Sequence, residues 1–218
     1  MREDELFEAW RNKYGDKFIP DGIVDEDTFA NERIRFVFVL KEVSECYNDF
    51  DLRCFLAQGA PGNGGHTWAP VTRWLGATVG ITFPSPPNMD TRIQWLKRIG
   101  AINLKKTTGT TVAIQSKIAQ AAEDDAELLK QQISLYLEKS TLFPCCGKGV
   151  FELFRDHVIN AGAYINNSTQ NGIKYIKFDN NGIAFSFCHP NAKKSRRPEL
   201  FAETVGQLSR LFASQCLC

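Results

Sequence analysis

The chain has 218 residues, of which 43% are hydrophobic and 23% charged, and its formal net charge at pH 7 is +1. This composition is ordinary for a globular protein and excludes a global polycation, so a polyanion has to bind at a local cluster of cations. No apolar stretch approaches the roughly 18 residues of a membrane span, and the acidic start MREDELFEAW lacks the pattern of a signal peptide. We therefore expect a cytoplasmic protein with no membrane partner.

Cysteine spacing gives no sign of a disulfide framework, a zinc site or an iron–sulfur cluster, because no CxxC pair occurs. The seven cysteines are Cys46, Cys54, Cys145, Cys146, Cys188, Cys216 and Cys218. We expect no metal and no cofactor.

The first half of the chain predicts one helix, one strand and a long connection. Phe7, Trp10 and Tyr14 recur at helical spacing over residues 3–14. The run IRFVFVL, residues 34–40, is rich in β-formers and predicts a buried strand. A glycine-rich connection over 41–70 follows, and helical spacing returns at positions 89, 93 and 96.

The second half predicts further strands alternating with helices. The strands are 99–104, 141–146, and a hairpin of 173–178 with 182–188 around Asp179-Asn180-Asn181. The helices are a long one over 118–136, one that begins after the Gly147-Lys148-Gly149 turn, and one over 201–211. This alternation predicts a single α/β domain over residues 1–218, with helix 3–14 packed on it. Its expected form is a three-layer αβα sandwich around a central, mostly parallel four-stranded sheet.

Ligands of such sheets bind beyond the carboxyl ends of the strands, so the residues there are the candidates for a site. Glu42 follows the first strand and is either a cleft carboxylate or a solvated loop acid. Phe50 and Phe55 further along could stack on a planar ligand or belong to the core.

The second strand ends at Asn103, whose amide has donors and an acceptor that can read a base edge, or that can cap the loop. Lys105, Lys106 and Thr107 beside it suit phosphate oxygens.

The last strand is followed by His189-Pro190. Proline has no N–H for strand pairing and its φ is fixed, so it ends the strand and restrains the backbone that carries the imidazole. Four cations follow the histidine, at positions where a polyanion would approach. They are Lys193, Lys194, Arg196 and Arg197. His66 in a glycine-rich loop and the 147–149 turn are weaker candidates, because neither matches a phosphate-loop spacing.

Four segments in this order resemble the motifs of the uracil-DNA glycosylase superfamily, over roughly residues 34–212. They are FVFVLKEVSE, INLKKTTG, ELLKQQISLYLEKSTLFPCCGKGVFE and FSFCHPNAKKS. Where that superfamily usually has a glycine at the first strand end and a proline in the loop, this chain has Leu40-Lys41-Glu42-Val43-Ser44. The segment 56–98 has no counterpart and reads as an insert.

The resemblance implies a uracil-DNA glycosylase-like fold and a monomeric enzyme that flips a nucleotide out of DNA and hydrolyses its N-glycosidic bond. The released base would be uracil or a modified pyrimidine, including a hypermodified phage cytosine in a defence role. By position, Glu42 would align water, Asn103 would read the base, His189 would face the base O2, and Phe50 or Phe55 would stack on it. The segment 191–197 would wedge into DNA.

Three activities are open at this point. A glycosylase is favoured by the resemblance, and it is expected to be monofunctional because no lysine is clearly placed for a Schiff base. A non-catalytic nucleic-acid-binding protein on the same fold is the alternative. A metal-dependent phosphoester hydrolase is third, since the strand ends offer too few acids for metal ions.

Overall fold

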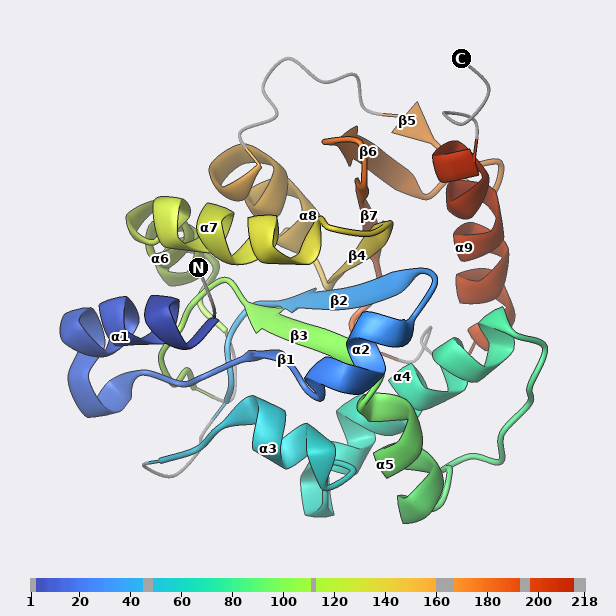
Figure 1. Cartoon of the computed structure of the whole chain (residues 1–218), viewed down its shortest axis with the longest axis horizontal. Coiled ribbons are helices and arrows are strands. Elements are labelled where there is room, and N and C mark those ends of the chain that lie inside the picture. The colour runs from blue at the N-terminus through green and yellow to red at the C-terminus, as the bar shows by residue number, and fades with distance from the viewer. Residues whose placement is uncertain (1–2, 45–48, 111–112, 160–166, 193–196, 214–218) are drawn as a thin grey trace.

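The computed structural model describes residues 3–44, 49–110, 113–159, 167–192 and 197–213. Its described strands form one seven-stranded sheet in the order β1-β3-β2-β4-β7-β6-β5 (Figure 1). The four central strands are mutually parallel: β3 (Ile99–Asn103), β2 (Arg35–Leu40), β4 (Thr141–Cys146) and β7 (Gly182–Phe187). An α/β fold with a mostly parallel centre is thus confirmed.

The expected number of four strands was too low, because three antiparallel strands extend the parallel centre. β1 (Gly22–Ile23) pairs with β3, β6 (Lys174–Phe178) pairs with β7, and β5 (Asn167–Ser168) pairs with β6. β6 is the first arm of the expected hairpin, whose turn residue Asp179 has φ +59°. The two-residue strands β1 and β5 are too short to show a period in the sequence.

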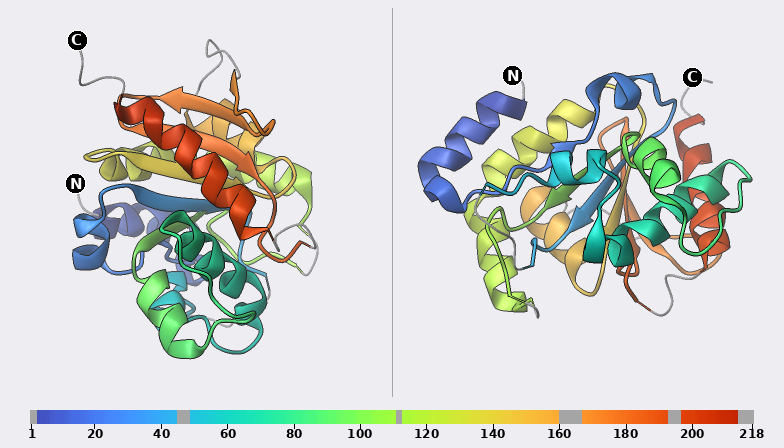
Figure 2. Two further views of the ribbon diagram at one scale, coloured as in Figure 1. Left: turned by 90° about the vertical axis from the view of Figure 1, so that its right-hand side faces the viewer. Right: turned by 90° about the horizontal axis from the view of Figure 1, so that it is seen from below.

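Helices cover both faces of the sheet (Figure 2). One face packs against α1 (Glu3–Tyr14), α6 (Gln115–Asp124), α7 (Ala126–Tyr136) and α8 (Val150–Leu153), which continues as the π-helical turn Phe154–Val158. The other face packs against α3 (Leu52–Ala57), α4 (Gly65–Thr78), α5 (Met89–Leu96) and α9 (Pro198–Ala213). Short elements complete the chain: α2 (Glu26–Asn31) and the 3₁₀ turns Gly15–Lys17 and Gly62–Gly64.

The segment expected to be a connection, 41–70, instead contains α3 and the first turns of α4. The Asp51 carboxylate caps α3 by accepting from the backbone N–H groups of Arg53 (2.8 Å) and Cys54 (3.3 Å). The insert belongs to the core, because Trp74 of α4 stacks on Phe38 of β2 and on Phe201 of α9. The described helices include none long and apolar enough to cross a bilayer.

The single long helix expected over 118–136 is two helices, α6 and α7, with a break at Asp125. The buried Asp125 carboxylate accepts from Lys13 Nζ (2.7 Å) and from the Tyr14 hydroxyl (2.9 Å), both at the end of α1. The break therefore serves the docking of α1 on this layer. Burial and the Asp125 bond raise the pKa of Tyr14 to about 12.

Candidate functional site

The carboxyl ends of the four parallel strands lie side by side at one edge of the sheet. Leu40 is level with Asn103 across β2 and β3, and Cys146 is level with Phe187 across β4 and β7. The segments that follow these strands therefore border one another, as the strand-end rule predicts. They carry Glu42, Lys105, Gly147 and His189.

Glu42 is held by Lys105, which comes from the neighbouring strand end. Lys105 Nζ lies 2.5 Å from Glu42 Oε2 and also donates to the carbonyl oxygens of Thr108 (2.6 Å) and Thr107 (3.3 Å). Only 6% of the Glu42 side chain and 17% of the Lys105 side chain are exposed. All three ammonium protons of Lys105 thus have acceptors within the protein, and the expected contact of Lys105 with DNA phosphate stays a prediction.

Backbone pairing holds the two strand ends together below this ion pair. Lys105 N–H donates to the Lys41 carbonyl (2.9 Å), and Gly109 N–H donates to the Val43 carbonyl (2.8 Å). A Cβ atom at position 109 would overlap the Glu42 carboxylate. Glycine at 109 is therefore what leaves room for Glu42.

His189 is fixed in one tautomer by the turn that follows it. Its Nδ1 accepts the backbone N–H of Asn191 (3.2 Å), and its carbonyl accepts the N–H of Ala192 (2.9 Å). Because Nδ1 is an acceptor, the neutral ring carries its proton on Nε2. Nε2–H is the donor that this imidazole can offer to a ligand.

The surroundings of His189 favour its neutral form. The ring lies against Gly147, where an added Cβ would be 3.6–3.7 Å from the His189 Cβ and Cδ2 atoms. Partial desolvation and the nearby charge of Lys41 both lower the pKa of His189 from its usual 6.5. The residue is nevertheless exposed, so the imidazole is accessible.

Glu42 and His189 lie at the same edge of the sheet but belong to different parts of it. Glu42 contacts the β3 side through Lys105, whereas His189 contacts the loop after β4. Lys41, next to Glu42 in the chain, is the charge that acts on His189. That the two side chains converge in one cleft stays a prediction.

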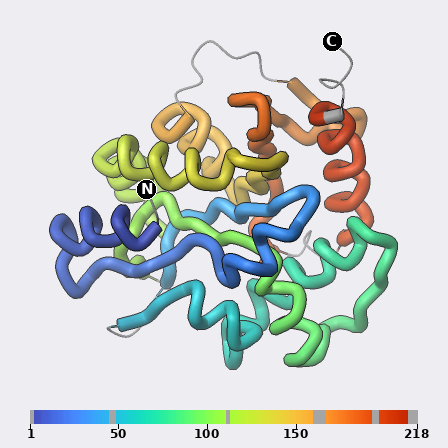
Figure 3. Tube along the Cα trace, in the orientation of Figure 1, coloured from blue at the N-terminus to red at the C-terminus, as the bar shows by residue number. Residues whose placement is uncertain are grey.

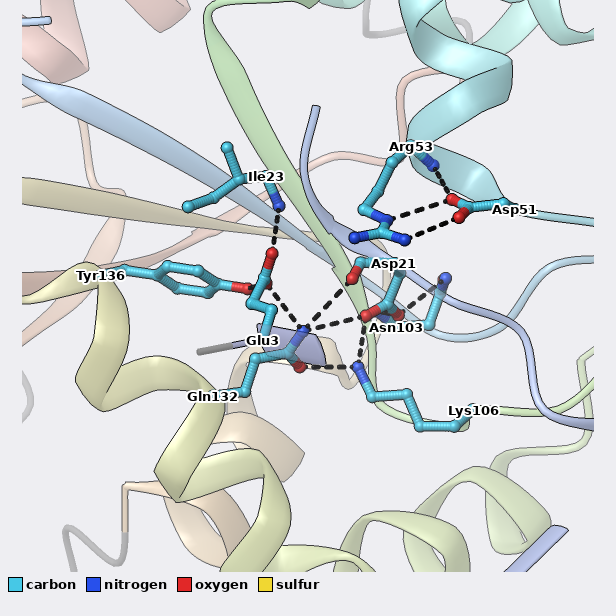
Figure 4. A network of polar contacts seen from close by, with 9 residues as sticks. All are labelled: Glu3, Asp21, Ile23, Asp51, Arg53, Asn103, Lys106, Gln132 and Tyr136. Atoms are coloured by element: carbon cyan, nitrogen blue, oxygen red, sulfur yellow. Dashed lines mark hydrogen bonds and ion pairs between the residues drawn. The ribbon is translucent and has the colours of Figure 1, made fainter. Parts of the chain in front are cut away.

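Asn103 and Lys106 point into a buried polar network rather than to the surface (Figure 4). The carboxylate of Asp21 accepts from Lys106 Nζ (2.6 Å), from the Asn103 backbone N–H (2.7 Å) and from Gln132 Nε2 (3.2 Å). The Asn103 amide lies 3.4 Å from the same carboxylate, and only 3% of the residue is exposed. In this structure Asn103 organises the strand end and is not presented to a base.

The expectation that Lys106 binds DNA phosphate is wrong, because its side chain is 0% exposed. Its ammonium also bonds Gln132 Oε1 (2.8 Å) and lies 4.6 Å from the Trp10 ring centroid. Sequence reasoning took Lys106 as exposed because it stands in the polar run KKTTGTT. The missed signal was Gln132, a polar residue on the apolar face of α7 between Leu129 and Ile133.

The network extends to the N-terminal helix, where Glu3 accepts from the hydroxyl of Tyr136 and from Gln132 Nε2 (3.3 Å). Burial raises the pKa of the Glu3 carboxyl, although these hydrogen bonds oppose the rise. Burial, with the Glu3 charge beside it, raises the pKa of Tyr136 well above its usual value. This polar cluster therefore ties α1, β1 and α7 to the end of β3.

The remaining expected site residues are the two phenylalanines after β2, Thr107 in the loop after β3, and the cations that precede α9, most of which lie outside the described residues. Phe50 and Phe55 form a tilted pair (centroids 5.3 Å apart) that is half-buried against the core. Thr107 is half-buried and bridges to Phe18. Arg197 is exposed just before α9, and positions 193–196 lie outside the described residues.

Within the residues that the structure describes, no group of three or more His, Cys, Asp or Glu side chains could hold a metal ion. Two cavities, of about 280 and 380 Å³, lie along α9 and α4, and neither is lined by Glu42, Lys105 or His189. The candidate site at the strand ends carries a carboxylate, an imidazole and glycine turns. Comparison with protein-family models and with curated proteins finds no match for this chain.

Proposed function

We propose that the protein is a monofunctional DNA glycosylase that hydrolyses the N-glycosidic bond of an extruded pyrimidine nucleotide and leaves an abasic site. The observation that carries this proposal is His189, an accessible imidazole at the carboxyl edge of a parallel sheet. It is fixed as the Nε2–H tautomer and its pKa is lowered. A neutral imidazole that donates from Nε2 is suited to the oxygen of a departing base anion.

Glu42 supplies the complementary charge. Cleavage of the glycosidic bond develops positive charge on the deoxyribose and negative charge on the base, and a carboxylate at the same edge stabilises the former and aligns water. The Lys105 bond holds this carboxylate in place before any substrate arrives, and Gly109 leaves the room that it occupies.

A water nucleophile, rather than a lysine, fits the state of Lys105. A Schiff base needs a neutral amine, whereas the Lys105 ammonium donates to one carboxylate and two carbonyl oxygens. This is the support for a monofunctional enzyme.

Base choice in this proposal does not use Asn103, since its amide is committed to Asp21. The half-buried rings of Phe50 and Phe55 are the remaining candidates for stacking on an extruded base. Uracil and modified pyrimidines, hypermodified phage cytosines included, are the substrates to be compared.

A non-catalytic nucleic-acid-binding protein is the second candidate, and the observation that favours it is the pairing of Glu42. A carboxylate that is 6% exposed and bonded to a lysine performs a structural role without any reaction. The two candidates differ in one measurable property, the formation of abasic sites.

The test is incubation with duplex and single-stranded oligonucleotides that each carry one uracil or modified pyrimidine, scored by alkaline cleavage at abasic sites. Under the proposal, His189→Ala and Glu42→Gln each slow cleavage by about 10²–10⁴-fold and leave DNA affinity largely intact. His66→Ala is the matched control, since His66 is exposed on α4 and should keep full activity. Cleavage of no substrate, with DNA binding retained, would establish the second candidate.

A further inference from the structure

The larger of these two cavities, about 380 Å³, lies among α4, α5 and α9 and reaches the amino end of β2. It is therefore at the opposite end of β2 from Glu42. Its wall is mainly apolar and includes Phe36, Leu75, Trp95 and Val205. A cavity of roughly 300–1,000 Å³ with apolar walls and few polar groups is typical of a small-molecule site.

An exposed glycine in the middle of α9 borders this cavity. Gly206 lines it, and a Cβ atom built there would meet no atom within 4 Å. Glycine inside a helix costs about 1 kcal/mol relative to alanine. Neither packing nor a left-handed backbone requires it here, so a larger side chain at position 206 has room to extend into the cavity.

Two arginines, Arg33 and Arg98, and one carboxylate, Glu32, line the cavity, so its charged groups sum to one positive charge. The Arg98 guanidinium carbon lies 4.7 Å from the Trp95 ring centroid, and Arg98 Nε lies 3.4 Å from Glu32 Oε1. Arg33, also in the wall, is exposed. Within the described residues, neither the terminal nitrogens of Arg98 nor the guanidinium of Arg33 has a bonded acceptor.

The hydroxyl groups in the wall are already used as donors. Thr78 Oγ1 donates to the Leu75 carbonyl (2.7 Å), and Ser209 Oγ donates to the Val205 carbonyl (2.7 Å). The donors left for a ligand are therefore those of the arginines, and guanidinium groups bind carboxylates in two-pronged geometry.

We propose that this cavity binds a small amphipathic anion, a free molecule with an aromatic or aliphatic body and one carboxylate group. The body packs on Trp95, Phe36 and Val205, and the carboxylate meets Arg98 and Arg33. The site is separate from the strand-end edge, so it stands whether or not the protein is a glycosylase.

The test compares naphthalene-2-carboxylate with its neutral analogue naphthalene-2-carboxamide by isothermal titration calorimetry on the full chain. We expect the acid to bind at least about tenfold more tightly than the amide, since a hydrogen bond to a charged group is the stronger kind. No heat of binding with millimolar acid, or equal affinities for acid and amide, would overturn the proposal.

Variants of residues that line the cavity test whether the ligand binds there. Gly206→Phe fills the space and should abolish binding of both compounds, whereas Gly206→Ala should retain it. Arg98→Gln should weaken the acid by about tenfold and leave the amide unchanged. Thermal melting of each variant checks the fold, and undiminished binding to a folded Gly206→Phe protein would show that the ligand binds elsewhere.

Discussion

Replacing Lys106 by methionine tests the buried polar network directly. The substitution keeps most of the side-chain volume and the contact with Trp10, but it removes the charge 2.6 Å from Asp21 Oδ1. Both side chains are 0% exposed, so the carboxylate is left without a counter-ion in the interior. Loss of one partner of a buried pair costs about 3–5 kcal/mol.

The structure places the expected loss near the lower limit of that range. Asp21 keeps its bonds from the Asn103 backbone N–H (2.7 Å) and from Gln132 Nε2 (3.2 Å), which still satisfy part of the carboxylate. We expect about 3 kcal/mol less stability, or a melting temperature lower by about 6–12 °C for a chain of this size.

Urea unfolding followed by tryptophan fluorescence at pH 7 measures this loss. Lys130→Met is the matched control, because Lys130 pairs with Glu127 on the surface of α7, with side chains 35% and 79% exposed. That control should change stability by less than about 0.5 kcal/mol. The double variant Lys106→Met with Asp21→Asn should recover part of the loss, since no buried charge remains. A cost below about 1 kcal/mol for Lys106→Met would refute the view that this pair is a buried ion pair.

Three further predictions concern single residues. The His189 ring should titrate below 6.5 in an NMR pH series, and Lys41→Met should move the midpoint upward, since Lys41 lowers this pKa; an unmoved midpoint would remove Lys41 as a cause. Gly109→Ala should displace the Glu42 carboxylate and reduce base excision about as much as Glu42→Gln, with binding to DNA retained; full activity would contradict the close fit at Gly109. Because burial raises the folded pKa of Glu3 above its usual 4.5, its contribution to stability is complete below that pH and is lost as the pH rises through the folded pKa. Glu3→Gln should therefore flatten the decline of unfolding free energy with rising pH, and an unchanged slope would exclude Glu3 as its source.

The sequence predicted the parts of the fold that a regular pattern encodes. The apolar runs at 34–40, 99–104, 141–146 and 182–188 are the four parallel strands, because strands buried on both faces are continuously apolar. Helix 3–14 was also predicted with its observed bounds. Elements that depend on distant partners were missed, such as β1, or misjudged, such as the helix broken at Asp125.

The candidate site was predicted less well than the fold, for the same physical reason. Strand-end reasoning correctly placed Glu42 and His189 at one edge of the sheet. The same reasoning could not predict that Lys105 forms an ion pair with Glu42, or that Lys106 is buried and forms an ion pair with Asp21. Both ion pairs join residues that are far apart in the sequence, and the local composition around each lysine does not indicate its partner.

The dependence of α1 on α7 has a consequence for the order of events during synthesis on the ribosome. Glu3 meets Tyr136 and Gln132, partners separated from it by 133 and 129 positions. Figure 3 shows the blue helix α1 beside α7. Helix α1 precedes α7 in the chain and leaves the exit tunnel before it, yet the surface that accepts α1 is complete only when α7 has been translated. Until then Phe7 and Trp10, both fully buried in the finished protein, have only part of their native core to enter, such as Phe18. The nascent chain therefore carries a partly uncovered aromatic face while the residues between α1 and α7 are translated, and such exposed apolar surface is what chaperones bind.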